Sequence, residues 1–167
     1  MVPVNCYGFR MWRCVEARVV APVILCFFLA ACHKPATPQA QIRTTITQAE
    51  EAVAQKDIAA LKAMVSDKFN DPEGHDKKAV ESIVRYYFMR NESIHLFTRV
   101  RKIDVADDTH LQTSVYAAMT SEPIKSAQEL EGLRADLYHF EFFFAKESGH
   151  WRVIKAEWRP AELIDFL

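Results

Sequence analysis

An uncharged apolar run near the N-terminus divides this chain into two parts, a predicted signal and a predicted folded domain. Residues 19–31 carry no charged side chain, and Arg10, Arg13 and Arg18 precede them. A basic start, a short apolar centre and small residues at the end are typical of a secretory signal. The run is shorter than the ~20 apolar residues that a transmembrane helix needs. We therefore expect residues 1–31 to be a removable signal peptide and the fold to lie beyond them.

The junction between the two parts reads Leu29-Ala30-Ala31-Cys32. Small residues directly before a cysteine resemble the lipobox of bacterial lipoproteins. In those proteins the thiol receives a diacylglycerol, the signal is cut before the cysteine, and the new amino group is acylated by a fatty acid such as palmitate. The resemblance implies that Cys32 is a lipidated N-terminus. It would carry more than one acyl chain, because a single acyl chain binds a membrane only marginally. The alternative is an ordinary signal that is cleaved elsewhere, with Cys32 incidental.

The residues after the junction bear on location. Residues 32–40 are rich in proline and small polar side chains, a composition that favours an extended spacer. We expect a flexible tether over 32–40 and the folded domain over 41–167. In lipoproteins of enteric-type bacteria an aspartate after the cysteine retains the protein in the inner membrane, and here that residue is His33. The resemblance therefore implies the outer membrane, facing the periplasm. Met11 is an alternative start, because a complete signal follows it.

Cysteine and charge content narrow the function classes. Of the four cysteines, Cys6, Cys14 and Cys26 lie in the signal, which leaves Cys32 alone in the mature chain. That excludes a disulfide framework and a thiol nucleophile in the mature domain. The mature chain is slightly acidic, so we expect no nucleic-acid partner. Its sequence has no glycine-rich phosphate loop, zinc-ligand spacing or Gly-x-Ser-x-Gly motif, so we expect no cofactor and no metal.

Helical periodicity dominates the first half of the mature chain. It predicts a helix over residues 42–55, and Asp57 and Asp76 are the expected N-caps of a second and a third helix. The third helix carries the cleanest apolar stripe of the chain. Its members are Val80, Ile83, Val84, Tyr87 and Phe88.

The second half changes to β-branched and aromatic residues with period-two alternation. The first predicted strand alternates imperfectly, which indicates a bulge. Pro160 ends the last strand, and the apolar tail 163–167 must pack across the sheet or on a partner chain. The predicted strands are 94–105, 111–117, 137–144 and 151–158, the last with Trp151, Val153 and Lys155 on one face.

Helices followed by an antiparallel meander indicate an α+β fold in which the N-terminal helices pack on a strongly curved sheet. One strand places four aromatic residues on a single face. We interpret them as hydrophobic core, the floor on which the third helix packs. They are Tyr138, Phe140, Phe142 and Phe144.

Three segments together resemble a nuclear transport factor 2-like domain of the SnoaL-like and ketosteroid-isomerase-like group. They are 54–61, which reads helix-Asp-helix, then 65–69, which contains Asp-x-Phe, and 142–153, which ends in Gly-x-Trp-Arg-Val. The resemblance covers about residues 42–158 and implies a cone-shaped, cystatin-like fold with a cavity at its open end. Members of the group include isomerases, cyclases, dehydratases and non-catalytic binding modules. No catalytic residue of such enzymes is recognisable here.

One polar turn is a candidate site. Asp71, Glu73, His75 and Asp76 cluster within it, so Asp71 or His75 is a candidate general base and the group is a candidate weak metal site. The interpretation that we favour is a solvated turn, because Pro72 and Gly74 explain the bend and Asp76 caps the next helix.

Two further groups of side chains are candidates for an interface or a pocket. His139, Glu141 and Phe143 share a strand face opposite the aromatic row, which predicts the outer surface of the sheet or a homodimer contact. Aromatic residues with polar tips are candidates for lining a ligand pocket. These are Tyr87, Tyr116, Tyr138 and Trp158.

Two function classes follow. The first is a cell-envelope lipoprotein whose cone domain binds a protein partner or a small apolar ligand without catalysis. The second is a small enzyme of the isomerase, cyclase or dehydratase type with an Asp or His general base in the cone. The position of Asp71 and His75 relative to the cavity separates them.

Overall fold

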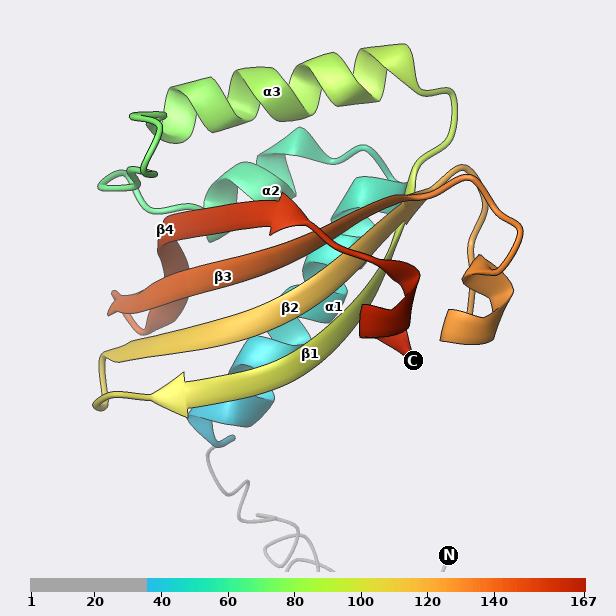
Figure 1. Ribbon diagram of the computed structural model, residues 1–167. Coiled ribbons are helices and arrows are strands. Elements are labelled where there is room, and N and C mark those ends of the chain that lie inside the picture. The colour runs from blue at the N-terminus through green and yellow to red at the C-terminus, as the bar shows by residue number, and fades with distance from the viewer. Residues whose placement is uncertain (1–35) are drawn as a thin grey trace, which may run out of the picture. The chain divides into compact units, whose positions relative to one another are not determined.

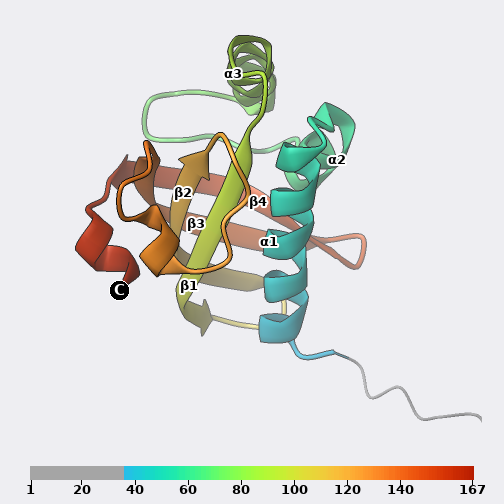
Figure 2. The same ribbon diagram turned by 90° about the vertical axis from the view of Figure 1, so that its right-hand side faces the viewer.

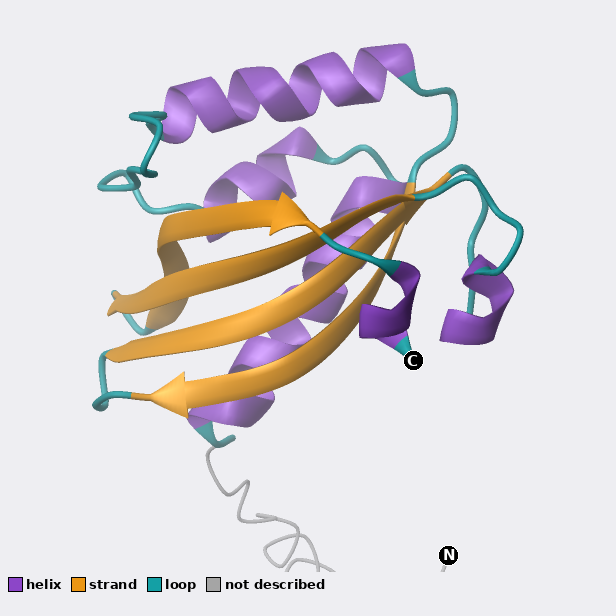
Figure 3. Ribbon diagram, in the orientation of Figure 1, coloured by secondary structure: helices purple, strands orange, loops and turns teal. Residues whose placement is uncertain are grey.

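The computed structural model describes residues 36–167. Its helices come first and an antiparallel sheet of order β1-β2-β3-β4 follows, which confirms the predicted α+β class (Figure 3). No helix in residues 36–167 is long and apolar enough to cross a bilayer. The elements are α1 (Pro38–Ala54), α2 (Ile58–Met64), α3 (Lys77–Arg90), β1 (His95–Val105), β2 (His110–Thr120), η1 (Ala127–Leu130), β3 (Asp136–Glu147), β4 (His150–Pro160) and η2 (Leu163–Phe166).

The start of the domain differs from the prediction. The signal peptide and the lipidation site lie outside the described residues, but the end of the predicted tether does not. Helix α1 begins at Pro38, and Thr37 caps it by accepting a 3.2 Å hydrogen bond from the Ala40 N–H. Proline suits the first helical position because its missing N–H would have no partner there. Residues 38–40 therefore belong to the domain, not to the tether.

The other two helix starts match the prediction. Asp57 and Asp76 each accept a hydrogen bond from the N–H three residues on, at 2.9 and 2.8 Å. Between α1 and α2, Lys56 adopts a left-handed conformation with φ of 54°. Its Nζ donates to the carbonyl oxygens of Phe88 and Asn91 at 3.0 and 2.6 Å, which fastens the end of α3 to the α1–α2 turn.

The sheet contains two irregularities, of which one was predicted. The bulge in β1 lies between Val100 and Lys102. A second register shift, in β4, places Lys155 opposite Phe143 but Val153 opposite Phe144. The prediction that Lys155 shares a face with Trp151 and Val153 is therefore wrong, because the extra residue turns Lys155 to the other side.

The three α-helices differ in how they pack on the sheet. Helices α1 and α2 lie on one face, here called the inner face, whereas α3 stands above the β4 edge and apart from the strands (Figures 1 and 2). The fully buried Ile42 of α1 packs in a core cluster with Leu111, Phe144 and Trp151 of the sheet. The opposite, outer face is partly covered by the C-terminal tail, where Phe166 is fully buried in a cluster with Ala118 and η1. The tail thus packs across the sheet.

Candidate ligand cavity

An apolar cavity of about 430 Å³ lies between α3 and the inner face of the sheet. Its wall on the α3 side is the predicted apolar stripe, and α1 and α2 close the back. Its floor is the aromatic row of β3, joined by Val115 and Ala117 of β2. The volume falls within the range of small-molecule sites in proteins.

The aromatic row is therefore a cavity floor rather than closed core, which corrects the prediction. Phe144 is buried, but Tyr138, Phe140 and Phe142 are half-buried. The rings of Phe140 and Phe142 stack at 5.2 Å with an angle of 4° between them. The α3 stripe does not close on these rings, because α3 is fastened to the α1–α2 turn and to α2 by Lys56 and by the 2.7 Å pair of Lys62 with Glu81.

The mouth of the cavity is marked by residues that line it and also face solvent. Ile83 of α3 is 39% exposed and Trp158 of β4 is 38% exposed, and both belong to the lining. The opening therefore lies between α3 and the edge strand. Trp158 is one of the predicted pocket residues.

Few polar groups reach the cavity. Tyr87 and Tyr138, both predicted, line it. Burial, together with the neighbouring Tyr87 and Asp136, raises the pKa of Tyr138 above its usual value, so its hydroxyl is neutral and can donate a hydrogen bond. Every buried side-chain nitrogen or oxygen in the described residues has a hydrogen-bond partner. The cavity thus offers a mostly hydrocarbon wall with a few hydroxyls and three charged side chains, which are described below.

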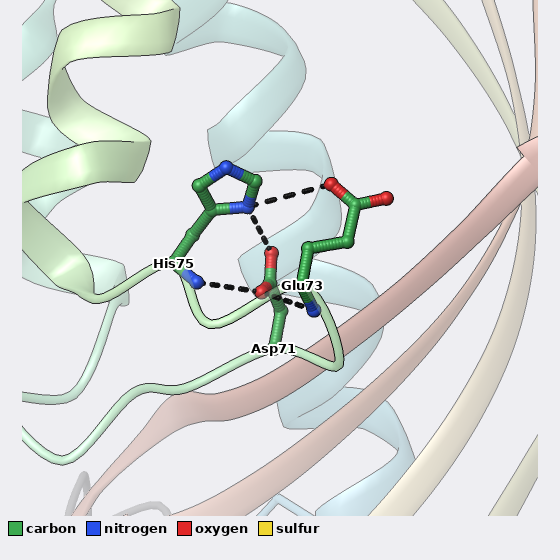
Figure 4. Close-up of side chains that lie close together, drawn as sticks. All are labelled: Asp71, Glu73 and His75. Carbon is green, nitrogen blue, oxygen red and sulfur yellow. Dashed lines mark hydrogen bonds and ion pairs between the residues drawn. The ribbon is translucent and has the colours of Figure 1, made fainter.

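The Asp71 turn lies beside the cavity and not in it. The Asp71 side chain is fully buried, contrary to the expectation of a solvated turn, whereas Glu73 and Asp76 are exposed. Asp71 Oδ1 accepts hydrogen bonds from the Glu73 and His75 N–H groups at 2.9 and 2.8 Å, and Oδ2 lies 2.7 Å from His75 Nδ1 (Figure 4). The turn folds around this carboxylate, which explains its burial.

The electrostatics of Asp71 are those of a structural anion. Burial acts to raise its pKa, but hydrogen bonds from the backbone and ring of His75, and from the Glu73 N–H, outweigh burial and hold the pKa below its usual value. A general base works best with a pKa near the operating pH. Neither Asp71 nor His75 lines the cavity, although the His75 ring stacks on Trp158 at 6.4 Å between centroids.

Asp71, Glu73 and His75 also place their ligand atoms within 4.8 Å of one another, the spacing of a metal site. Both oxygens of Asp71 are already occupied by donors, however, and Glu73 Oε2 is 3.6 Å from His75 Nδ1. Hydrogen bonding within the turn accounts for the grouping.

No family model and no curated protein matches the chain in sequence. Solved structures do match in shape. A provisionally named scytalone dehydratase from Novosphingobium aromaticivorans has a TM-score of 0.62 at 12% identity, covering 74% of this chain and 84% of its own. A protein of unknown function with a cystatin-like fold from Nostoc punctiforme has a TM-score of 0.58 at 11% identity, over 75% and 93%. Bd1075 of Bdellovibrio bacteriovorus has a TM-score of 0.57 at 15% identity, over 72% of this chain and 40% of its own.

The fold is nuclear transport factor 2-like. This confirms the fold that the resemblance implied. At these identities the likeness shows the fold alone, and a fold of this kind hosts many functions. Function must therefore be argued from the cavity and its surroundings.

Within this nuclear transport factor 2-like fold, Tyr116 lies on the outer face and does not line the cavity, contrary to expectation. It stacks on His139 at 4.6 Å and meets Phe166 edge-on at 5.7 Å. His139 Nε2 lies 2.6 Å from Ser114 Oγ and 3.1 Å from Glu141 Oε1, and its side chain is only 12% exposed.

The predicted interface group does lie on the outer face. Phe143 is half-buried there, with Lys155 Nζ 5.0 Å from the centre of its ring. A homodimer contact through His139, Glu141 and Phe143 stays a prediction.

The prediction missed three charged residues in the cavity lining: Lys62, Lys77 and Glu81. A signal for two of them was present, because Lys77 and Glu81 are four residues apart and each lies seven residues before an apolar member of the stripe, Val84 or Phe88, which places all four on one face of α3. Long side chains can lie along an apolar wall while their charged ends reach water. The predicted stripe contained only the apolar residues of this face.

Proposed function

We propose that this protein is a lipid-anchored protein of the bacterial cell envelope whose cone domain binds a small apolar ligand without catalysing its conversion. The observation that carries the proposal is the cavity, which is lined by the α3 stripe and the β3 aromatic row instead of being filled by them. Empty apolar space costs packing energy, and a ligand that fills it recovers that energy.

The enzyme alternative has less support. It requires an acid or base at the reacting atoms, and the two candidates, Asp71 and His75, lie outside the cavity lining. The name of the Novosphingobium relative refers to a dehydratase, but that relative shares 12% identity with this chain. The lipid anchor rests on the Leu29–Cys32 junction of the sequence.

A series of linear alcohols from hexanol to dodecanol tests the proposal by calorimetric titration. Each buried CH₂ contributes ~0.8 kcal/mol, so affinity should rise by up to roughly fourfold per carbon until the cavity is full. Val84→Trp, which places a bulky ring in the cavity from α3, should weaken binding and lower the chain length at which the affinity stops rising. Val105→Trp is the matched control, because Val105 lies outside the lining. An affinity that is independent of chain length, or equal in both variants, would refute the proposal.

A further inference from the structure

The charged residues that line the cavity all come from one side, the α2–α3 side. They are Lys62, Lys77 and Glu81, and the rest of the lining is uncharged. Their ion pairs differ in exposure, and this difference points to the chemistry of the ligand.

The negative charge of Glu81 is balanced by two cations. Its two oxygens lie 2.7 Å from Lys62 Nζ and 2.7 Å from an Arg85 nitrogen, so two cations face one carboxylate. Both cations lower the pKa of Glu81 through hydrogen bonds and charge, and the carboxylate is ionised at neutral pH. This end of the cavity therefore does not present an unbalanced negative charge.

The positive charge of Lys77 is only weakly balanced. Its side chain is 18% exposed and lines the cavity, yet its acidic partner, Asp67 at 2.8 Å, is 94% exposed. A pair with so exposed a carboxylate is worth little, because water and salt screen it. Lys77 also occupies the first turn of α3, where the helix dipole disfavours a cation and favours an anion.

We propose that the ligand is a single-chain amphiphile whose apolar chain fills the cavity and whose anionic end group pairs with Lys77. This rests on the proposed function and names the ligand class for the same site. An anion in the cavity beside the Lys77 side chain would be less exposed to water than Asp67 and would form a stronger charge-assisted hydrogen bond than Asp67 does. The chain fits by size, since 430 Å³ is roughly three times the ~150 Å³ of a cavity that holds benzene.

The test is competitive titration of the domain with dodecanoate, dodecanol and dodecylamine, all below their micellar concentrations. Dodecanoate should bind roughly tenfold or more tightly than dodecanol, and dodecylamine more weakly than either. Lys77→Met should remove the preference for dodecanoate over dodecanol, and its urea-unfolding midpoint, measured beside that of wild type, shows whether the variant is folded. Lys77→Arg should restore the preference. Dodecyl phosphate distinguishes a phosphate-bearing lipid from a carboxylic acid as the source of the anion.

Two further variants sharpen the result. Asp67→Asn removes the competing carboxylate and should tighten dodecanoate binding by up to roughly fivefold, with dodecanol unchanged. Lys155→Met makes the same charge change on the outer face and should leave all affinities as they are. Equal binding of dodecanoate and dodecanol, or a preference that survives Lys77→Met, would overturn the anionic ligand and leave the proposed function standing. Failure of all these ligands to bind would refute both.

Discussion

Asp71 and His75 form a 2.7 Å hydrogen bond in which the acceptor carboxylate is fully buried and the imidazole is one-third exposed. The pair resembles a catalytic dyad in its spacing. Its surroundings are those of a folded turn, because the same carboxylate also accepts two backbone N–H groups. We therefore assign the pair to stability, and that assignment can be tested.

Replacement of Asp71 by Asn should lower the free energy of unfolding and weaken its dependence on acid pH. Since the pKa of Asp71 in the folded state is below the unfolded value of ~3.9, its contribution is fully present above about pH 4 and is lost as pH falls through the folded pKa. Urea unfolding of wild type and variant between pH 7 and pH 2.5 measures this difference. Asp108→Asn, at an exposed position, is the control. An Asp71→Asn variant as stable as wild type at pH 7 would contradict the assignment.

Removal of the Lys56 ammonium should loosen α3. Its Nζ binds the carbonyl oxygens of Phe88 and Asn91 at the end of that helix. A hydrogen bond from a charged donor contributes ~1.5–3 kcal/mol, so Lys56→Met should cost about that much and speed amide exchange in the last turn of α3. Lys68→Met serves as a comparison on an exposed lysine. Unchanged exchange in α3 would show that Lys56 does not fasten the helix.

Truncation of Phe166 should destabilise the whole domain. Its side chain is fully buried and lies 5.7 Å from the Tyr116 ring and 6.5 Å from the Phe97 ring. Phe166→Ala should cost ~3–5 kcal/mol in urea unfolding, whereas Ile164→Ala, at a position 67% exposed, should change stability by less than ~0.5 kcal/mol. Similar losses in the two variants would mean that the tail is not anchored by Phe166.

The starts of α2 and α3 could be predicted because their causes are local. Asp57 and Asp76 are side chains that accept helix N–H groups, and this preference is visible in sequence. Tyr116 could also have been placed correctly, since it alternates with Val115 and Ala117, which line the cavity. Its polar tip was given more weight than its position in the alternation.

The resemblance implied a cavity, but its place between α3 and the β3 aromatic row could not be predicted, nor could the β4 bulge, because both depend on residues that are distant in sequence. The distance of α3 from the sheet depends on Lys56 and on the Lys62–Glu81 pair, which join residues distant in sequence. The extra residue in β4 shows only in the pairing with β3, so strict alternation placed Lys155 on the wrong face.

Replacement of Cys32 by Ser tests the lipid anchor. If the Leu29–Cys32 junction is a lipobox, the wild-type chain should incorporate labelled palmitate and fractionate with membranes, and Cys32→Ser should do neither. Cys26→Ser, within the predicted signal, is the matched control. Labelling that persists in Cys32→Ser would rule out this cysteine as the anchor.

Native mass spectrometry of residues 33–167, purified without added ligand, tests the central claim most directly. We expect a retained small amphiphile on the wild-type domain, or uptake of added dodecanol, and less of either on Val84→Trp, whose new ring reduces the cavity. A ligand-free wild-type domain that also fails to take up dodecanol would contradict binding in the cavity.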